Sequence, residues 1–293
     1  MTPDILIIAN PASGGGHGRS VAERAARYIS AYGGQASVVL TQGRGDATRL
    51  ARDALRDGIL RIVACGGDGT THEIAGVLAG SDAALGMLPC GRGNDFARAL
   101  GIPTQPAAAV AVVLDGITRQ IDLGRVNGRH FCTVVTLGFD SEVARLVYDK
   151  RVPFTGTAAY ICGVLTMLVR YRGIALRAHG DFGTLNGPVL LAATGNTTTY
   201  GGGMRILPQA RPDDGLLDVC HVRMLPPLAV LRLFPTVFWG GHVTHPAVTI
   251  FRTRRLTVET PEPVWLFADG EPIGQTPAEI SLAERALTVF IPR

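Results

Sequence analysis

The residues with the clearest chemistry form one short glycine-rich segment, Gly66-Gly67-Asp68-Gly69-Thr70, directly after an apolar run. Glycines lack a Cβ, so their backbone N–H groups can approach an anion closely, and a helix starting near Thr70 would add its positive end. A carboxylate such as that of Asp68 repels phosphates unless a hard cation such as Mg²⁺ lies between them. The alternative is a tight turn with Asp68 as a helix cap. The segment favours a site for phosphate and Mg²⁺.

Two more polar, glycine-rich loops also follow apolar runs, one covering residues 10–16 and the other residues 88–98. Each alone is a common turn, but parallel strands bring such loops to the same edge of a sheet. Three loops at one edge predict a nucleotide site. The sequence has no GxxxxGK[ST] motif, and its single lysine, Lys150, lies far from the loops. Backbone amides, Mg²⁺ and arginine must therefore hold the phosphates.

A parallel sheet is the element that would position these loops. Apolar runs that predict strands alternate with helical patterns at residues 4–9, 19–32, 36–40, 46–56, 61–65 and 85–88. This alternation predicts a parallel sheet with helices on both faces. After about Asp122, short β-like runs and turns replace the pattern. We therefore expect an α/β domain over residues 1–122 and a mostly antiparallel β domain over residues 123–293.

Composition narrows the class of protein. Hydrophobic residues make up 46% and charged residues 18%, which is typical of a well-buried globular protein. The net charge of +4 is too small to indicate a nucleic-acid partner. Five well-separated cysteines without a CxxC pair favour a reducing cytoplasm over a disulfide framework or a zinc site. Residues 1–20 lack the pattern of a signal peptide. We expect a cytoplasmic protein.

Three further segments leave alternatives open. Asp269-Gly270-Glu271 and Asp213-Asp214-Gly215 are typical of turns, and they also concentrate carboxylates. The apolar stretch 158–169 covers about half a membrane span, which favours a packed helix over an anchor. Apolar side chains between residues 225 and 239 form either a lipid-facing surface or plain core. Contact with a membrane would therefore be peripheral, at the inner face.

Taken together, the motifs resemble the diacylglycerol kinase catalytic-domain superfamily, in particular its soluble bacterial lipid kinases. The resemblance runs along nearly the whole chain, through NPASGGG at 10–16, GGDGTTHEIAGVL at 66–78, LPCGRGNDFARALG at 88–101, LGFDSEV at 137–143, PDDGLLDV at 212–219 and ADGEP at 268–272. It implies an NAD-kinase-like α/β nucleotide domain and a C-terminal antiparallel β-sandwich. ATP and the acceptor would meet in the cleft, and the last strand would return toward the first domain.

The resemblance also implies which residues contact ATP. They would come from the three loops and from the end of the second strand, at Asn10, Pro11, Ala12, Ser13, Gly14, Thr41, Gly66, Gly67, Asp68, Gly69, Thr70 and Asn94. One position departs from the pattern, because Arg92 stands where many relatives have threonine. Its side chain either binds a phosphate or anionic headgroup or points to solvent.

Catalytic and metal-binding roles follow from the same resemblance. The proton acceptor maps onto Glu271, with Asp269 or Asp95 to orient it, and Asp68 would hold Mg²⁺ near the triphosphate. A structural Mg²⁺ would be held by one carboxylate and two backbone carbonyls, those of Asp214, Arg211 and Leu216, which are suitable ligands for a hard cation.

The function that the resemblance implies is phosphoryl transfer from ATP to a hydroxyl of a diacylglycerol-like lipid at the membrane surface. An NAD kinase would share Asp68 and its loop, but the loop at Asn10 and the segment 213–216 fit lipid kinases better. A catalytically silent, nucleotide-dependent lipid-binding protein is the alternative from another class. The intact carboxylates of Asp68, Asp95 and Glu271 speak against it. A monomer and a homodimer both remain open, and the acceptor lipid is not identified.

Overall fold

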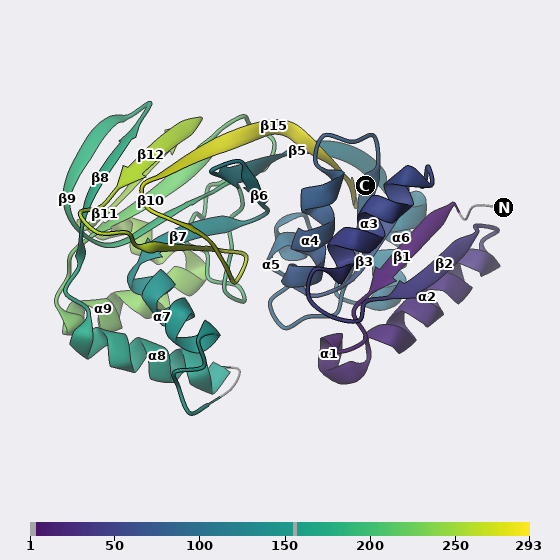
Figure 1. The fold of residues 1–293 in the computed structure, drawn as a ribbon, viewed down its shortest axis with the longest axis horizontal. Helices are drawn as coiled ribbons and strands as arrows, with labels where there is room; N and C mark the ends of the chain where they lie inside the picture. Colours follow the sequence, from purple (N-terminus) through teal and green to yellow (C-terminus); the bar gives the residue numbers. More distant parts are fainter. Residues whose placement is uncertain (1–3, 155–156) are drawn as a thin grey trace. The chain divides into compact units, whose positions relative to one another are not determined.

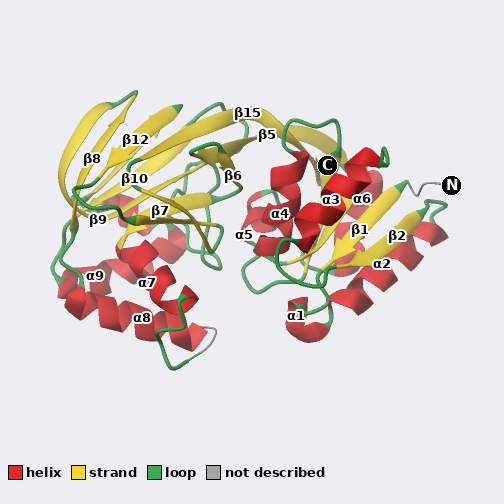
Figure 2. Cartoon of the chain, in the orientation of Figure 1, coloured by secondary structure: helices red, strands yellow, loops and turns green. Residues whose placement is uncertain are grey.

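The computed structural model describes residues 4–154 and 157–293. These residues form two compact units, one ending at Leu123 and resumed over Glu284–Arg293, and the other covering Gly124–Ala283. Strands β5 (Ile117–Val126) and β15 (Ala278–Ile291) contribute residues to both units. Figure 1 labels the elements, and Figure 2 colours them by type.

The first unit is built on a parallel sheet with the strand order β4-β3-β1-β2. The end of β15 extends it, pairing in parallel with β4 through Thr288 and Val289. Every residue of β1 is buried, as expected for a parallel strand covered on both faces. The strands span Ile5–Ala9 (β1), Ala36–Leu40 (β2), Arg61–Gly66 (β3) and Ala84–Pro89 (β4).

Two pairs of helices pack on this sheet. Helices α2 and α6 contact each other, and so do α3 and α4, and each pair packs on strands of the sheet. Helix α3 buries Ala47, Ala51 and Ala54, whose spacing places small side chains along one stripe. The helical segments are α1 (Ser13–Gly16), α2 (Gly18–Ala31), α3 (Asp46–Arg56), α4 (Asp68–Leu78), α5 (Asp95–Ala99) and α6 (Pro106–Asp115).

The second unit is an antiparallel β structure. Its main path is β14-β13-β7-β9-β8-β12-β15, and β10 joins β9 to β11. Side chains alternate between two cores, so that Val135 of β7 packs in one core and Val134 in the other. The remaining strands are β6 (Arg129–Phe131), β7 (Val134–Gly138), β8 (Ile174–Gly180), β9 (Gly183–Gly195), β10 (Leu217–Arg223), β11 (Val248–Thr253), β12 (Arg255–Glu259), β13 (Trp265–Ala268) and β14 (Glu271–Gln275).

Helices cover one face of the second unit. The core beneath them contains Phe139, Leu168, Val230 and Val237, each from a different helical segment. These segments are α7 (Phe139–Tyr148), α8 (Thr157–Arg170), α9 (Pro227–Leu233) and the 3₁₀ helices η1 (Phe234–Trp239) and η2 (Gly241–Thr244). Among the described residues, no helix combines the length and hydropathy needed to cross a bilayer.

The predicted fold class is confirmed. The four strands predicted before residue 90 begin within one residue of β1, β2, β3 and β4, and they pair in parallel. Within the second unit, Gly124–Ala283, the strands pair antiparallel, as the short β-like runs indicated, whereas the end of β15 pairs in parallel with β4. The strands could be predicted from hydrophobic periodicity because each predicted strand is either continuously apolar or alternates between apolar and polar residues.

Candidate active site

Backbone hydrogen bonds hold the first residues of the three glycine-rich loops in register at one edge of the parallel sheet. The N–H of Asn10 donates to the carbonyl of Cys65 at 2.9 Å, and that of Cys90 donates to Gly66 at 2.8 Å. Thr41, after β2, donates its N–H to the carbonyl of Ala9 at 2.9 Å. The first loop (residues 10–16, after β1), the second (residues 66–70, after β3) and the third (residues 88–98, after β4) are therefore neighbours, and Thr41 lies beside the first.

Glycines allow these loops to touch through their backbones. A Cβ added at Gly91 would lie 2.5 Å from the Cα of Gly67, which no real side chain tolerates. A Cβ added at Gly14 would lie 3.0 Å from the carbonyl oxygen of Cys90. The first loop therefore packs on the third, and the third packs on the second. The result is a surface of backbone N–H and C=O groups with few side chains in the way.

The first loop has the backbone conformation of an anion-binding concavity. The side-chain oxygen of Asn10 accepts a hydrogen bond from the N–H of Ala12 at 3.0 Å and so fixes the turn. Ala12 is right-handed, whereas Gly14 and Gly15 have φ values of 63° and 69°. Right-handed residues followed by left-handed ones point successive N–H groups into one hollow. The predicted contacts Pro11 and Ser13 belong to this same turn.

Asp68 is not the helix cap that the alternative interpretation requires. Gly67 occupies the N-cap position of α4, and Asp68, Gly69 and Thr70 form its first turn. The Asp68 carboxylate accepts a hydrogen bond from the N–H of Phe96 at 3.4 Å, so it faces the start of α5. Thr70 packs against Gly66, where an added Cβ would meet the Thr70 hydroxyl at 2.6 Å.

Asn94 shapes the third loop. Its side-chain oxygen accepts from the N–H of Gly91 at 2.9 Å, and its amide donates to the carbonyl of Gly91 at 2.8 Å. Asn94 itself is left-handed and precedes Asp95, the buried first residue of α5. The Arg92 side chain is exposed and makes no hydrogen bond or ion pair within the described chain. An exposed arginine without a protein partner is compatible with both alternatives, binding of a phosphate and exposure to solvent.

Asp269 and Glu271 lie together on one tight hairpin of the second unit. Asp269 and Gly270 have φ values of 51° and 84° and connect β13 to β14, as a type I′ turn requires. The Asp269 carboxylate accepts from the N–H groups of Cys132 and Thr133 at 2.7 and 2.9 Å, and from the Thr133 hydroxyl at 2.5 Å. These hydrogen bonds fix the turn. Glu271 is the first residue of β14, and its side chain is half-buried.

The predicted cation loop carries a carboxylate that already has protein partners. Asp214 accepts a hydrogen bond from the N–H of Leu216 at 3.2 Å and pairs with Arg252. Arg252 also lies 3.7 Å from Asp218, which is 2% exposed. Burial raises the pKa of Asp218 to about 6, with Arg252 acting in the opposite direction. A buried carboxylate beside Asp214, with the backbone carbonyls of this turn, fits a hard cation.

Sequence reasoning missed two carboxylates with structural roles near the motifs. Glu73, on α4, accepts from the N–H groups of Gly45 and Thr48 at 2.9 and 3.2 Å, and so connects the start of α3 to α4. Asp140 accepts from the Thr136 hydroxyl at 3.1 Å, and burial raises its pKa to about 6. Both residues stand inside recognised motifs, but only tertiary contacts reveal these roles.

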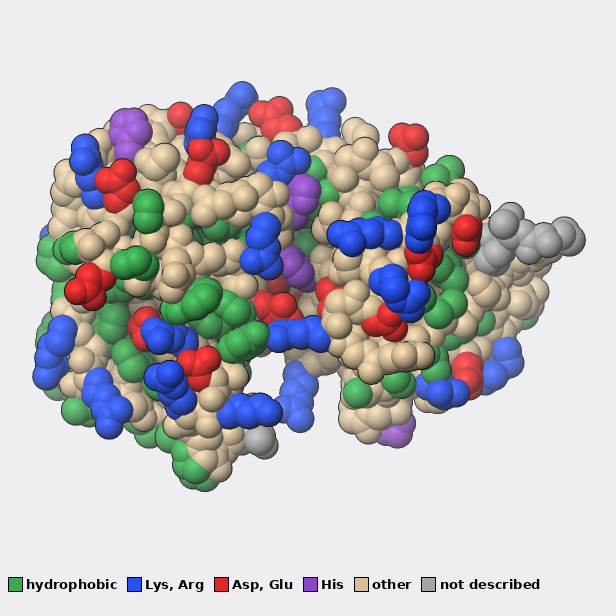
Figure 3. All heavy atoms as spheres, viewed as in Figure 1, with side chains coloured by type: hydrophobic (Ala, Val, Ile, Leu, Met, Phe, Trp, Pro, Cys, Tyr) green, Lys and Arg blue, Asp and Glu red, His purple; other side chains and the backbone are tan. Residues whose placement is uncertain are grey.

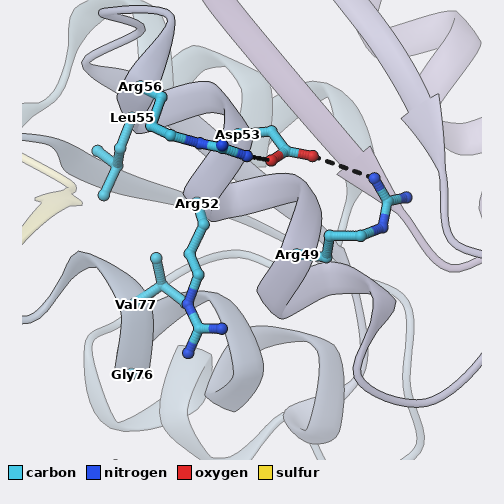
Figure 4. Close-up of a pocket in the computed structure, with 7 residues that line it drawn as sticks. All are labelled: Arg49, Arg52, Asp53, Leu55, Arg56, Gly76 and Val77. Atoms are coloured by element: carbon cyan, nitrogen blue, oxygen red, sulfur yellow. Dashed lines mark hydrogen bonds and ion pairs between the residues drawn. The ribbon is translucent and has the colours of Figure 1, made fainter.

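A surface pocket of the first unit lies between α3 and α4 (Figure 4). It is lined by Arg49, Arg52, Asp53, Leu55, Arg56, Gly76 and Val77. Asp53 pairs with Arg49 at 3.1 Å and with Arg56, which neutralises part of the basic charge. None of the lining residues belongs to the three loops, so this pocket is separate from the predicted nucleotide site.

The chain is similar to known proteins along nearly its whole length. Residues 4–126 match the model of the diacylglycerol kinase catalytic domain, and residues 133–291 match the YegS C-terminal NAD kinase beta sandwich-like domain. The chain is 38% identical to a diacylglycerol kinase of Mycobacterium tuberculosis over 99% of its own length and 95% of the relative's. It is 29% identical to a diacylglycerol kinase of Staphylococcus carnosus, covering 98% and 94% of the two chains.

A solved structure shares the fold. The crystal structure of a diacylglycerol kinase from Bacillus anthracis superposes with a TM-score of 0.78 at 22% identity, over 98% of this chain and 96% of the other. This superposition compares the fold alone. The two domain models and the full-length relatives show that this chain belongs to the diacylglycerol kinase family of lipid kinases.

Proposed function

We propose that this lipid kinase transfers the γ-phosphoryl group of ATP to the hydroxyl of diacylglycerol or a closely related lipid. The observation that carries the proposal is the contact between Gly67 and Gly91, which joins two loops into a backbone-lined surface beside Asp68. Such a surface is suited to a phosphate chain, because N–H groups bind anions without a lysine. The lipid acceptor is inferred from the relatives, which are diacylglycerol kinases.

The loops of the first unit would bind the nucleotide. The hollow at Gly14 and the start of α4 offer N–H donors, and Asn94 keeps the third loop in shape. A bound Mg²⁺ would neutralise charge on the phosphates, and we assign the Asp68 carboxylate to hold it. Because phosphoryl transfer depends on positioning and charge neutralisation, rigid loops with close backbone contacts suit the reaction.

Glu271 is the residue we propose as general base. It would accept the proton of the lipid hydroxyl while the new O–P bond forms and the bond to the ADP oxygen breaks. Asp269 is then a positioning residue, because its carboxylate is engaged by Cys132 and Thr133. We assign Asp95 a supporting role at the start of α5, where it is buried next to Asn94.

A second Mg²⁺ with a structural role is proposed at the turn that contains Arg211, Asp214 and Leu216. The carbonyls of Arg211 and Leu216 and the Asp214 carboxylate would be ligands, and Asp218 is a nearby buried carboxylate. Arg252 pairs with Asp214 in this structure and would have to release it. The enzyme would meet its lipid as a peripheral protein at the membrane surface.

The rival functions make different predictions for one experiment. The purified protein is incubated with labelled ATP and Mg²⁺, and separately with diacylglycerol, phosphatidylglycerol, a sphingoid base and NAD. We expect label in phosphatidic acid or in a closely related phospholipid. Label in NADP would indicate an NAD kinase, and no labelled product beside measurable ATP binding would indicate a silent binding protein. The Asp68→Asn variant is the control for contaminating kinases.

A further inference from the structure

Helix α8 is apolar on the side that faces away from the protein. Leu168 and Ala159 are buried on its inner side. On its outer side, Ile161, Leu165 and Val169 follow one another at intervals of four residues and are 57%, 57% and 73% exposed. A helix on the surface of a globular protein normally presents polar residues there. The outer stripe therefore has no function in packing the core of the second unit.

The segment α9–η1 has the same property. Val230 and Val237 pack in the core, while Leu231, Phe238 and Trp239 are 48%, 50% and 63% exposed. Exposed tryptophan is costly to leave in water, because it is among the largest apolar side chains. The turn from α9 into η1 thus carries a second group of outward apolar side chains.

The two groups lie on adjacent elements, because α8 contacts α9 (Figure 1) and α9 contacts η1. We call Ile161, Leu165, Val169, Leu231, Phe238 and Trp239 the apolar face. The first unit exposes Tyr28, Tyr32, Leu60 and Ile117, and the second unit also exposes Tyr148, Phe154, Tyr160, Leu228 and Phe234. Contiguous apolar patches on a folded protein usually mark an interaction site, whereas isolated ones do not.

The charged residues around the apolar face indicate which kind of partner it contacts. Neither residues 150–180 nor residues 219–258 include an acidic residue, although both segments contain several basic ones. Arg170 and Arg232 flank the apolar face, are exposed, and form no ion pair with any residue that the structure describes. Figure 3 shows Lys and Arg side chains beside hydrophobic ones around the lower left edge, where Figure 1 draws α8 and α9, with some Asp and Glu side chains nearby. The surroundings are therefore suited to an anionic partner.

We propose that the apolar face is the surface by which this protein docks on a membrane that contains anionic phospholipid. Apolar side chains with arginine beside them match a bilayer interface, where acyl chains lie below a layer of phosphates. Tryptophan prefers this boundary, since its ring is apolar and its N–H is polar. The proposal deepens the proposed function, on which it rests, because it names the surface that meets the lipid phase.

Trp239 provides a direct probe, since the chain has only two tryptophans and the other, Trp265, is half-buried in β13. In a Trp265→Phe background, emission of Trp239 is recorded with phosphatidylcholine vesicles and with mixed phosphatidylcholine–phosphatidylglycerol vesicles. We expect a blue shift with the mixed vesicles and quenching by brominated acyl chains. Unchanged emission and no quenching would overturn the proposal.

Matched variants test the two parts of the surface. Leu165→Glu and Leu60→Glu change similarly exposed leucines, 57% and 52%, but only the first lies on the apolar face. We expect Leu165→Glu to lose most sedimentation with mixed vesicles and Leu60→Glu to keep it. Arg232→Gln should lower the partition coefficient about fivefold, the effect of one basic residue near an anionic surface. Equal partitioning of the two leucine variants would contradict the assignment.

The assay separates this proposal from the kinase proposal. Vesicle binding does not require ATP or turnover, so it can succeed even if no lipid is phosphorylated. If the enzyme is active, Leu165→Glu should keep its activity on a short-chain diacylglycerol dispersed as monomers and lose it on bilayers. Sedimentation velocity without lipid tests a second copy as the partner. A wild-type dimer that Leu165→Glu dissociates, without any vesicle binding, would overturn the membrane assignment.

Discussion

Gly67 and Gly91 belong to loops that follow different strands, yet a Cβ added at Gly91 would lie 2.5 Å from the Cα of Gly67. The hydrogen bond from Cys90 to Gly66 holds the same two loops in register one residue earlier. Since only glycine permits this contact, the two glycines place Asp68 and Asn94 at one edge of the sheet. The nucleotide site that we propose depends on that close approach.

Gly91→Ala should therefore push the second and third loops apart. We expect the Kd of a non-hydrolysable Mg²⁺–ATP analogue to rise about tenfold or more, equivalent to one lost hydrogen bond to a charged group. Gly76→Ala is the control, because an added Cβ there meets nothing within 4 Å and alanine favours the helix. Calorimetric titration measures both. Wild-type affinity in Gly91→Ala would mean that the contact does not shape the site.

The variants Asp269→Asn and Glu271→Gln should differ in effect, because the first should lower stability and the second should lower kcat. Asp269→Asn places an amide among three donors and should cost about 1–3 kcal/mol of stability, seen as a lower Tm. Glu271→Gln should leave the Tm near that of wild type and lower kcat about 10²–10⁴-fold, the usual contribution of a general base. If Glu271→Gln turns over normally while a folded Asp269→Asn is inactive, the roles must be exchanged.

Removal of metal should reveal the cation proposed at Asp214. We expect EDTA to lower the Tm of the wild type and Mg²⁺ to restore it, since a ligand at a hundredfold excess over its Kd stabilises by about 2.7 kcal/mol. The Tm of Asp214→Asn should not respond. Arg252→Gln removes the partner of Asp214 and should make the response larger. A wild-type Tm that is indifferent to EDTA would argue against a bound cation.

Asp140 should make stability depend on pH. Its folded pKa of about 6 is raised by burial above the ordinary value of about 3.9, so the folded state holds this proton more tightly than the unfolded state. The stability contribution of Asp140 is then least favourable above pH 6 and improves as the pH falls from about 6 to 4. Asp140→Asn should gain up to about 2–3 kcal/mol over wild type at pH 7. Chemical denaturation from pH 4 to 8 measures the difference, and a gain that does not shrink toward pH 4 would contradict the assignment.

Structural features that depend on residues close together in the sequence could be predicted best. Continuous apolar runs located the strands that end at Ala9, Gly66 and Pro89, and glycine-rich loops located the edge of the sheet where they meet. The hairpin at Asp269 followed from turn chemistry. Each of these features depends on neighbours within a few residues of the chain.

Contacts between distant residues could not be predicted. Asp269 binds Thr133 across 136 residues, and Glu73 binds Gly45 across 28. Neither partner carries a pattern that identifies the other. The outward apolar stripe at Leu165 was equally undetermined, because periodicity shows that a helix has apolar sides without showing which side is buried. These contacts decide which carboxylates have a structural role and which remain available for chemistry.

Single-turnover phosphoryl transfer tests the central claim most directly. Excess enzyme is mixed with labelled ATP, Mg²⁺ and short-chain diacylglycerol, and the reaction is quenched at intervals. The wild type should form labelled phosphatidic acid in a single phase. Asp68→Asn should bind the ATP analogue and keep its Tm, yet form product at least about 10³-fold more slowly, as expected when charge stabilisation of the transition state is lost. Product formation by Asp68→Asn at the wild-type rate, or its absence in the wild type, would contradict the account.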